Sequence, residues 1–150
     1  MPLDADAVLG GCYLVAIKGA DKHKRRLNSL IHKTAQQVTR GLYVAGQLIE
    51  LSAEKSITQG SISGAGHIPS RPGEPPNADT RFLDMNIETH IVSQSPPHVR
   101  VISNAPYSAA LEFGTSKMAE RPFMRPATIK HEKDVRNAVA TAVARVVRSS

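Results

Sequence analysis

Residues 21–56 read DKHKRRLNSLIHKTAQQVTRGLYVAGQLIELSAEKS, the longest regular pattern in the chain. Apolar or small residues recur there at every third or fourth position, which predicts one amphipathic helix. The positions on this stripe are Leu27, Ile31, Thr34/Ala35, Val38, Leu42, Ala45, Ile49 and Ser52/Ala53. Asp21 is the predicted N-cap, because its carboxylate can accept hydrogen bonds from first-turn N–H groups.

The length of this predicted helix is unusual for a chain of 150 residues. At 1.5 Å per residue, a helix of about 35 residues is about 50 Å long. Gly41 and Gly46 each lower helix stability by about 1 kcal/mol relative to alanine. We therefore expect the helix either to protrude from the domain or to break near these glycines.

Two irregular segments flank the helix. Residues 1–12 are predicted to be a flexible arm, and YLVAIKG at 13–19 a short strand. Residues 60–80, GSISGAGHIPSRPGEPPNADT, contain few apolar residues and are predicted to be a long Gly/Pro-rich loop. Loops of about 20 residues are uncommon unless they are functional or disordered.

Period-two alternation follows this loop and predicts a half-buried strand. Leu83, Met85, Ile87 and Ile91 alternate with Asp84, Asn86, Glu88 and His90. SQSPP at 93–97 can turn the chain, and HVRVIS at 98–103 alternates again. We expect an antiparallel β-hairpin or a small sheet.

The remainder predicts a short helical turn ended by Gly114 and a second amphipathic helix, with Pro126 in its first turn. The apolar stripe of this helix includes Ile129, Val135, Val139 and Val146. The chain is thus predicted to be a single α+β domain, residues 1–150, with a long N-terminal helix, an antiparallel hairpin or small sheet, and a C-terminal helix packed on it.

The charge balance is basic, with a net charge of +6 and a pI of about 9.8. The surplus lies in the two helical ends of the sequence, and its densest cluster is DKHKRR at 21–26. Lys22, Lys24, Arg25 and Arg26 are therefore candidate contacts to duplex DNA or to an acidic partner. The simpler interpretation, a solvated helix start, is favoured because no aromatic or base-reading residue accompanies the cluster.

Little in the sequence favours catalysis or a cofactor. The six histidines have no metal-ligand spacing, and no HExxH or CxxC motif occurs. GSISG has Ile62 where a nucleophile elbow would have serine. We therefore predict no catalytic, cofactor-binding or metal-binding residues. The single Cys12 excludes an internal disulfide and fits a reducing compartment, and no apolar run reaches the length of a membrane span.

Residues 107–127, YSAALEFGTSKMAERPFMRPA, hold two of the three phenylalanines and a proline-framed Phe-Met-Arg. Leu111 and Phe113 could be core residues beside a proline-shaped loop. Alternatively, the segment could be a rigid loop that docks onto a neighbour, since Phe, Met and Arg are enriched at interface cores. The candidate inter-subunit or partner-interface residues are Tyr107, Glu112, Phe113, Arg121, Phe123, Met124 and Arg125.

The segment PYSAALEFGTSKMAERPFMRPA at 106–127 resembles the C-terminal signature of a tailed-bacteriophage family of minor tail or head–tail joining proteins, also called tail-completion or neck proteins. The matching residues are Tyr107, Glu112, Phe113, Gly114, Thr115, Pro122, Phe123, Pro126 and Ala127. PSRPGEPPNADTRFLDMNI at 69–87 is similar to the family's Pro-Gly-x-Pro-Pro segment. Arg81 departs from the pattern, because the family usually has glycine there, which would permit a positive φ.

This resemblance implies a non-enzymatic virion protein that assembles in the host cytoplasm into a homo-oligomeric ring, a hexamer or a multiple of it. The ring would join the head to the tail tube, and its implied neighbours are connector, tail-terminator or tail-tube proteins. Ring closure uses heterologous contacts between subunits, and the loops at 60–80 and 107–127 are the candidates for them. Glu112 could pair with Arg121 or Arg125 within or between subunits, and the basic helix faces could line the DNA channel.

Two other interpretations remain open at this stage. The chain could form a tail-terminator or stopper ring of the same stack, or it could be a basic DNA-binding protein. A hydrolase is a minor third possibility.

Overall fold

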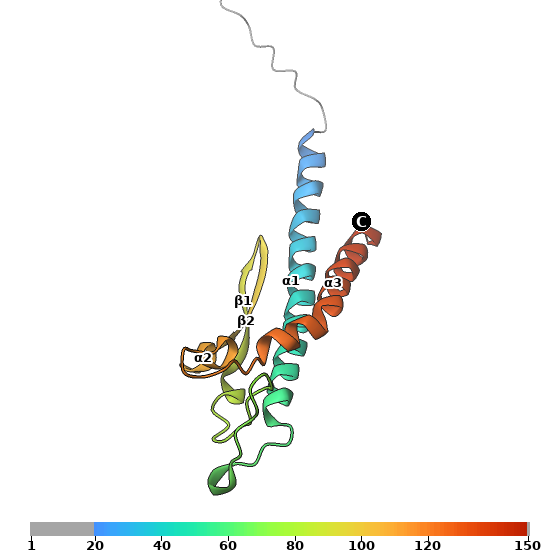
Figure 1. Ribbon diagram of the computed structural model, residues 1–150. Helices are drawn as coiled ribbons and strands as arrows, with labels where there is room; N and C mark the ends of the chain where they lie inside the picture. Colours follow the sequence, from blue (N-terminus) through green and yellow to red (C-terminus); the bar gives the residue numbers. More distant parts are fainter. Residues whose placement is uncertain (1–19, 150) are drawn as a thin grey trace, which may run out of the picture.

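The computed structural model describes residues 20–149 (Figure 1). The predicted arm, the predicted strand at 13–19 and Cys12 lie outside the described residues. Helix α1 (Ala20–Thr58) is a single helix of 39 residues, about 58 Å long, and it continues through both glycines. Its first turns extend beyond the other described elements. Asp21 lies inside the first turn rather than at the N-cap, where its charge still favours the helix dipole.

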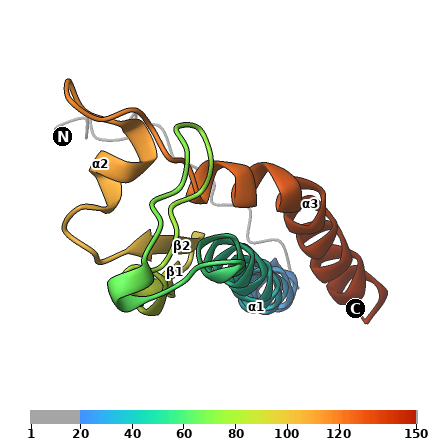
Figure 2. The same ribbon diagram turned by 60° about the horizontal axis from the view of Figure 1, so that its bottom comes forward.

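Strands β1 (Ile87–Gln94) and β2 (Pro97–Ser103) form the predicted antiparallel hairpin. Short helix α2 (Ser108–Phe113) follows, and α3 (Met124–Arg148) is the C-terminal helix. Figure 2 shows α1 between the hairpin and α3, and α1 contacts both of them. The predicted α+β class, with its long N-terminal helix, hairpin and packed C-terminal helix, is confirmed.

The two glycines of α1 lie at close approaches to these neighbours. A Cβ on Gly41 would stand 3.2 Å from the carbonyl oxygen of Ala138 in α3. A Cβ on Gly46 would stand 2.7 Å from Cγ2 of Thr89 in β1. Glycine lowers the helix propensity at both positions, but only a residue without a Cβ lets α3 and β1 approach the backbone of α1 this closely.

The core lies toward the C-terminal end of α1, where the hairpin, the loop before it and the start of α3 meet. Its buried residues are Ile49, Ala53, Ile57, Ala78, Leu83, Ile87, Ala105, Phe123 and Ala127. Phe123 and Ile57 are its largest fully buried side chains. Small and aliphatic residues thus form most of this core, as expected from the low aromatic content.

The alternation before and within β1 did not predict burial correctly at three positions, one of which is Asp84, a residue of the predicted polar face that is 3% exposed. Met85 is 72% exposed, because Asp84–Asn86 form a 3-10 turn instead of an extended strand. Ile91 is exposed near an irregularity between Ile91 and Ser93, where the strand register shifts. Leu83 and Ile87 are buried as predicted.

The 60–80 loop contains a 3-10 turn at Gly64–Gly66 and is tied to the rest of the domain by backbone hydrogen bonds. The N–H of Ala78 donates to the carbonyl of Ile57 at the end of α1, at 3.0 Å. The N–H of Gly73 donates to the carbonyl of Glu120, at 2.9 Å, in the connector between α2 and α3. The loop therefore packs against the segment 107–127.

Candidate functional site

Glu112 joins α2 to the beginning of α3. Its carboxylate accepts backbone N–H bonds from Phe123 at 2.8 Å, Met124 at 3.0 Å and Arg125 at 2.9 Å. These donors lack intrahelical partners because they open a helix, and the helix dipole favours an anion at this end. Glu112 is 7% exposed and thus acts as an N-cap supplied from another helix.

The turn that brings Glu112 to α3 depends on Gly114. This residue has a φ of 72°, and a Cβ there would meet the carbonyl oxygen of Met118 at 2.9 Å. The chain folds back through a bridge between Thr115 and Met118, and the N–H of Arg121 donates to the carbonyl of Leu111 at 2.7 Å. Gly114 ends α2 as predicted, and the connector is held firmly enough to position the cap.

The predicted ion pair of Glu112 is a secondary contact. Nε of Arg125 lies 4.0 Å from Oε1 of Glu112, and its Nη2 lies 3.5 Å from Oε2 of Glu120. The same guanidinium stands 5.8 Å from the ring centre of Phe113, within range of a cation–π contact. Arg121 forms no ion pair among residues 20–149.

The structure separates the candidate interface residues into two groups. Phe123 is 1% exposed and Met124 packs partly buried against the core, so these residues stabilise the fold of the chain. Phe123 was a candidate interface residue; its side chain fills the core of this chain, and the interface role stays a prediction. Phe113, at 71% exposed, and Tyr107 lie on the surface.

An exposed aromatic pair that the sequence interpretation missed lies beside α2. The ring centres of Phe82 and Tyr107 are 6.3 Å apart, and both side chains are exposed. They border a shallow depression with Met85, Thr80 and Asn86. Phe82 and Tyr107 are separated by the whole hairpin in sequence, so no local pattern could have paired them.

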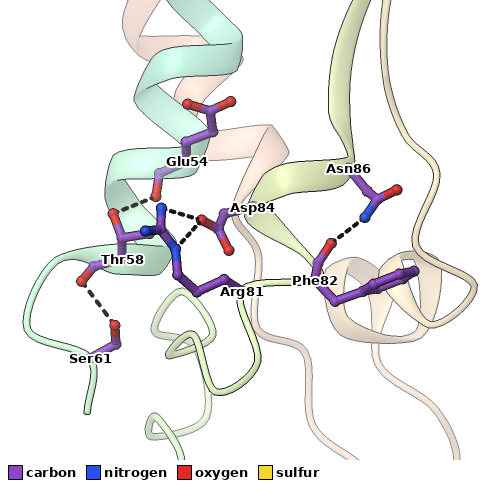
Figure 3. A network of polar contacts seen from close by, with 7 residues as sticks. All are labelled: Glu54, Thr58, Ser61, Arg81, Phe82, Asp84 and Asn86. Carbon is purple, nitrogen blue, oxygen red and sulfur yellow. Dashed lines mark hydrogen bonds and ion pairs between the residues drawn. The ribbon is translucent and has the colours of Figure 1, made fainter. Parts of the chain in front are cut away.

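Arg81 has a φ of 62°, a left-handed conformation that glycine adopts more readily than other residues. Its Nε and Nη2 donate to Oδ2 of buried Asp84 at 3.1 and 3.0 Å. Figure 3 shows the guanidinium between Asp84 and the end of α1, beside Glu54 and Thr58. Burial raises the pKa of Glu54, and the carboxylates of Glu50 and Asp84 raise it further, while Arg81 lowers it.

The predicted basic contacts lie on the part of α1 that extends beyond the other elements. Residues 20–29, including Lys22, Lys24, Arg25 and Arg26, are all exposed. Leu27 and Ile31, which belong to the predicted apolar stripe, are 46% and 60% exposed. The stripe is buried only farther along, at Ala45, Ile49 and Ala53.

Within residues 20–149, no group of three or more His, Cys, Asp or Glu side chains is arranged to hold a metal ion. His90 contacts Glu88 at 2.7 Å, and the register pairs it with Arg100. No helix in this part of the chain is both long and apolar enough to cross a membrane. The arrangement around Glu112 is a helix cap made by a side chain of another helix.

Comparisons with protein-family models, with curated proteins and with solved structures gave no match for this chain.

Proposed function

We propose that this chain is a non-enzymatic virion subunit of a tailed phage, which self-associates into a ring at the head–tail junction and joins the head to the tail tube. The resemblance of residues 106–127 to the tail-completion and neck signature supports the phage assignment. A tail-terminator or stopper ring of the same stack is the nearest variant of this proposal.

The observation that carries the self-association is the uncovered apolar stripe of α1. Leu27 and Ile31 continue the stripe beyond the buried region, and Val147 near the end of α3 is also exposed. Exposed apolar surface of this kind commonly marks a protein–protein contact. A neighbouring subunit can cover it, and repeated heterologous contacts of this type close into rings.

The segment around Glu112 supplies a preorganised second contact surface. The cap and the connector hydrogen bonds hold Phe113 and Arg125 in place before any partner arrives. A rigid surface loses less conformational entropy on association than a mobile one. Phe113 and Arg125, together with Tyr107, are the interface candidates that remain on the surface.

Self-association is tested by mass photometry and sedimentation velocity of the purified full chain, where a hexamer or a multiple of it is expected. The double variant Leu27→Ser/Ile31→Ser should remain folded and shift the distribution toward monomer. Lys33→Ser, on the same helix, is the matched control and should keep the oligomer. A wild-type chain that stays monomeric at tens of micromolar, or an oligomer unaffected by the double variant, would contradict the proposed contact.

The position in the particle is tested separately. Electron microscopy of phage particles that carry a gold-labelled tag on this chain should place the label at the head–tail junction. Label at the distal tail tip or on the capsid faces would contradict the position at the head–tail junction, but it would not contradict self-association.

A second candidate function, non-specific DNA binding, is favoured by the exposed basic residues Lys22, Lys24 and Arg25 on the protruding end of α1. If several phosphates are contacted, affinity for duplex DNA should fall by orders of magnitude between 50 and 200 mM salt. Fluorescence anisotropy with a labelled duplex measures this dependence. No binding at low salt would remove the alternative.

A further inference from the structure

A pocket of about 210 Å³ lies between the 60–80 loop and the segment that carries Glu112. The loop and the turn after it contribute Ser70, Asn77 and Asp79 to its lining, α2 contributes Leu111, and the connector contributes Arg121. Its position follows from the backbone bond that ties Gly73 to Glu120. The pocket is therefore built from two segments that the fold holds together, rather than from one mobile loop.

Two residues that line this pocket each carry a buried polar atom without a hydrogen-bond partner. Oγ of Ser70 and Nε of Arg121 are both buried, and neither bonds to any atom of residues 20–149. Ser70 is 8% exposed. Buried polar groups in native proteins are nearly always paired, so a buried hydroxyl and a buried Nε without partners are unusual.

Arg121 differs from the three arginines for which the structure shows an ion pair. Arg81, Arg125 and Arg136 each contact a carboxylate within 4.0 Å. Arg121 is held by its backbone, whose N–H donates to Leu111, but its side chain has no carboxylate in reach. Two residues that each carry a donor without an acceptor therefore line one cavity, and paired donors of this kind suit an oxyanion.

We propose that this pocket binds a carboxylate group, with the Arg121 guanidinium and the Ser70 hydroxyl as its donors. Arginine pairs with carboxylates through parallel N–H···O bonds, and the hydroxyl supplies a further donor. Asp79 also lines the pocket, so a singly charged carboxylate fits its charge better than a doubly charged phosphate. Phe82 and Tyr107, which line the same pocket, offer apolar surface to the carbon chain that carries the carboxylate.

The source of the carboxylate can be a free organic acid, an acidic side chain or a chain terminus. Three probes distinguish them: acetate, acetyl-glutamate amide and acetyl-alanine. The full chain, labelled with ¹⁵N, is titrated with each probe while the arginine Nε–Hε resonances are followed by NMR, at constant ionic strength. Arg121 should show a saturable shift, and the probe that binds most tightly identifies the source.

Variants locate the binding in the pocket. Arg121→Gln should abolish the saturable shift of the neighbouring backbone amides, and Ser70→Ala should weaken binding about 5- to 10-fold. Arg100→Gln, on β2 outside the pocket, should bind like the wild type. No saturable shift with any of the three probes, or tighter binding of inorganic phosphate than of every carboxylate, overturns the proposal.

A stability measurement guards against a variant that merely fails to fold. If Arg121 is retained for a ligand, Arg121→Met should raise the thermal midpoint by a few degrees, because it removes an unpaired, half-buried charge. A fall in the midpoint would show that Arg121 supports the fold and would contradict the binding role. The inference does not depend on the proposed place in a phage particle.

Discussion

Glu112 accepts a hydrogen bond at 2.8 Å from the backbone N–H of Phe123, whose side chain is the largest in the fully buried core. Glu112 caps the start of α3, and the side chain of Phe123 packs into the core at the same place. Both contacts therefore fix the position of α3. We therefore expect that removing the Glu112 carboxylate weakens the packing of Phe123, and that truncating Phe123 weakens the cap.

The cap is tested by Glu112→Ala and Glu112→Gln. The alanine variant leaves three N–H groups without their acceptor and should lower the free energy of unfolding by about 2–3 kcal/mol. Glutamine keeps one acceptor oxygen but loses the charge that favours the helix dipole, so about 1 kcal/mol should be lost. Urea denaturation measures both. Glu120→Gln, on the exposed connector, is the control, and an equal loss in all three variants would argue against capping.

Two phenylalanines from the same segment should respond differently to truncation. Phe123→Ala should lower the free energy of unfolding by about 3–5 kcal/mol, because it opens a cavity in the core. Phe113→Ala should change it by no more than about 0.5 kcal/mol, because the side chain is exposed. If Phe113 serves the proposed ring contact, its variant should instead shift the oligomer toward monomer in sedimentation velocity. If Phe113→Ala instead lowers the free energy of unfolding by more than this, Phe113 stabilises the fold and the ring-contact role is contradicted.

Gly46→Ala should destabilise the protein despite the better helix propensity of alanine. The added Cβ would lie 2.7 Å from Cγ2 of Thr89, whose hydroxyl donates to Glu50 at 2.6 Å and so resists rotation. Overpacking of this kind costs about 1–3 kcal/mol, more than the propensity gain of about 1 kcal/mol.

The matching rescue for Gly46→Ala is Thr89→Ser, which removes Cγ2 and keeps the hydroxyl. In a double-mutant cycle by thermal denaturation, the combined variant should recover most of the loss. If the losses of stability from Gly46→Ala and Thr89→Ser simply add in the double variant, the added Cβ does not clash with Cγ2 of Thr89.

The raised pKa of Glu54 predicts that the stability of the fold depends on pH. Burial and the carboxylates of Glu50 and Asp84 raise its pKa, so the folded state binds the proton more tightly than the unfolded state. The stability from this group is complete below the unfolded pKa and is lost as the pH rises through the folded pKa. Glu54→Gln should therefore raise the thermal midpoint at pH 7, with a smaller gain below the ordinary glutamate pKa.

Thermal melts across this pH range measure the effect of Glu54→Gln, and Glu132→Gln on the exposed face of α3 supplies the baseline for loss of a charge. A gain that grows as the pH falls would reverse the predicted sign.

The helices and the hairpin could be predicted because their signals are local. Periodicity in α1 and α3 and the alternation around Ile87 follow from how side chains project from each element. Gly114 was also predictable, because few other residues end a helix with a positive φ. The exposure of Met85 and Ile91 was not predictable in this way, since a 3-10 turn and a register shift interrupt the alternation.

The candidate site depended on contacts that sequence spacing does not encode. Glu112 was predicted as an interface residue, and a carboxylate followed by two arginines suggested an ion pair rather than a cap for a helix 11 residues away. The proximity of Phe82 to Tyr107 and of Ser70 to the connector arises from the tertiary fold. Arg81 offered one usable signal, because a non-glycine residue at a left-handed position needs local support, and Asp84 three positions later provides it.

The spacing of Gly41 and Gly46 has a consequence for how this protein can evolve. At about 100° per residue, five positions place the two close approaches about 140° apart around the axis of α1. One faces Ala138 of α3 and the other faces Thr89 of the hairpin. Inserting or deleting one residue between them would turn one approach by about 100° and misdirect a whole element. Homologues should therefore keep the number of residues between the two glycines constant, whereas chain length should vary in the exposed part of the 60–80 loop.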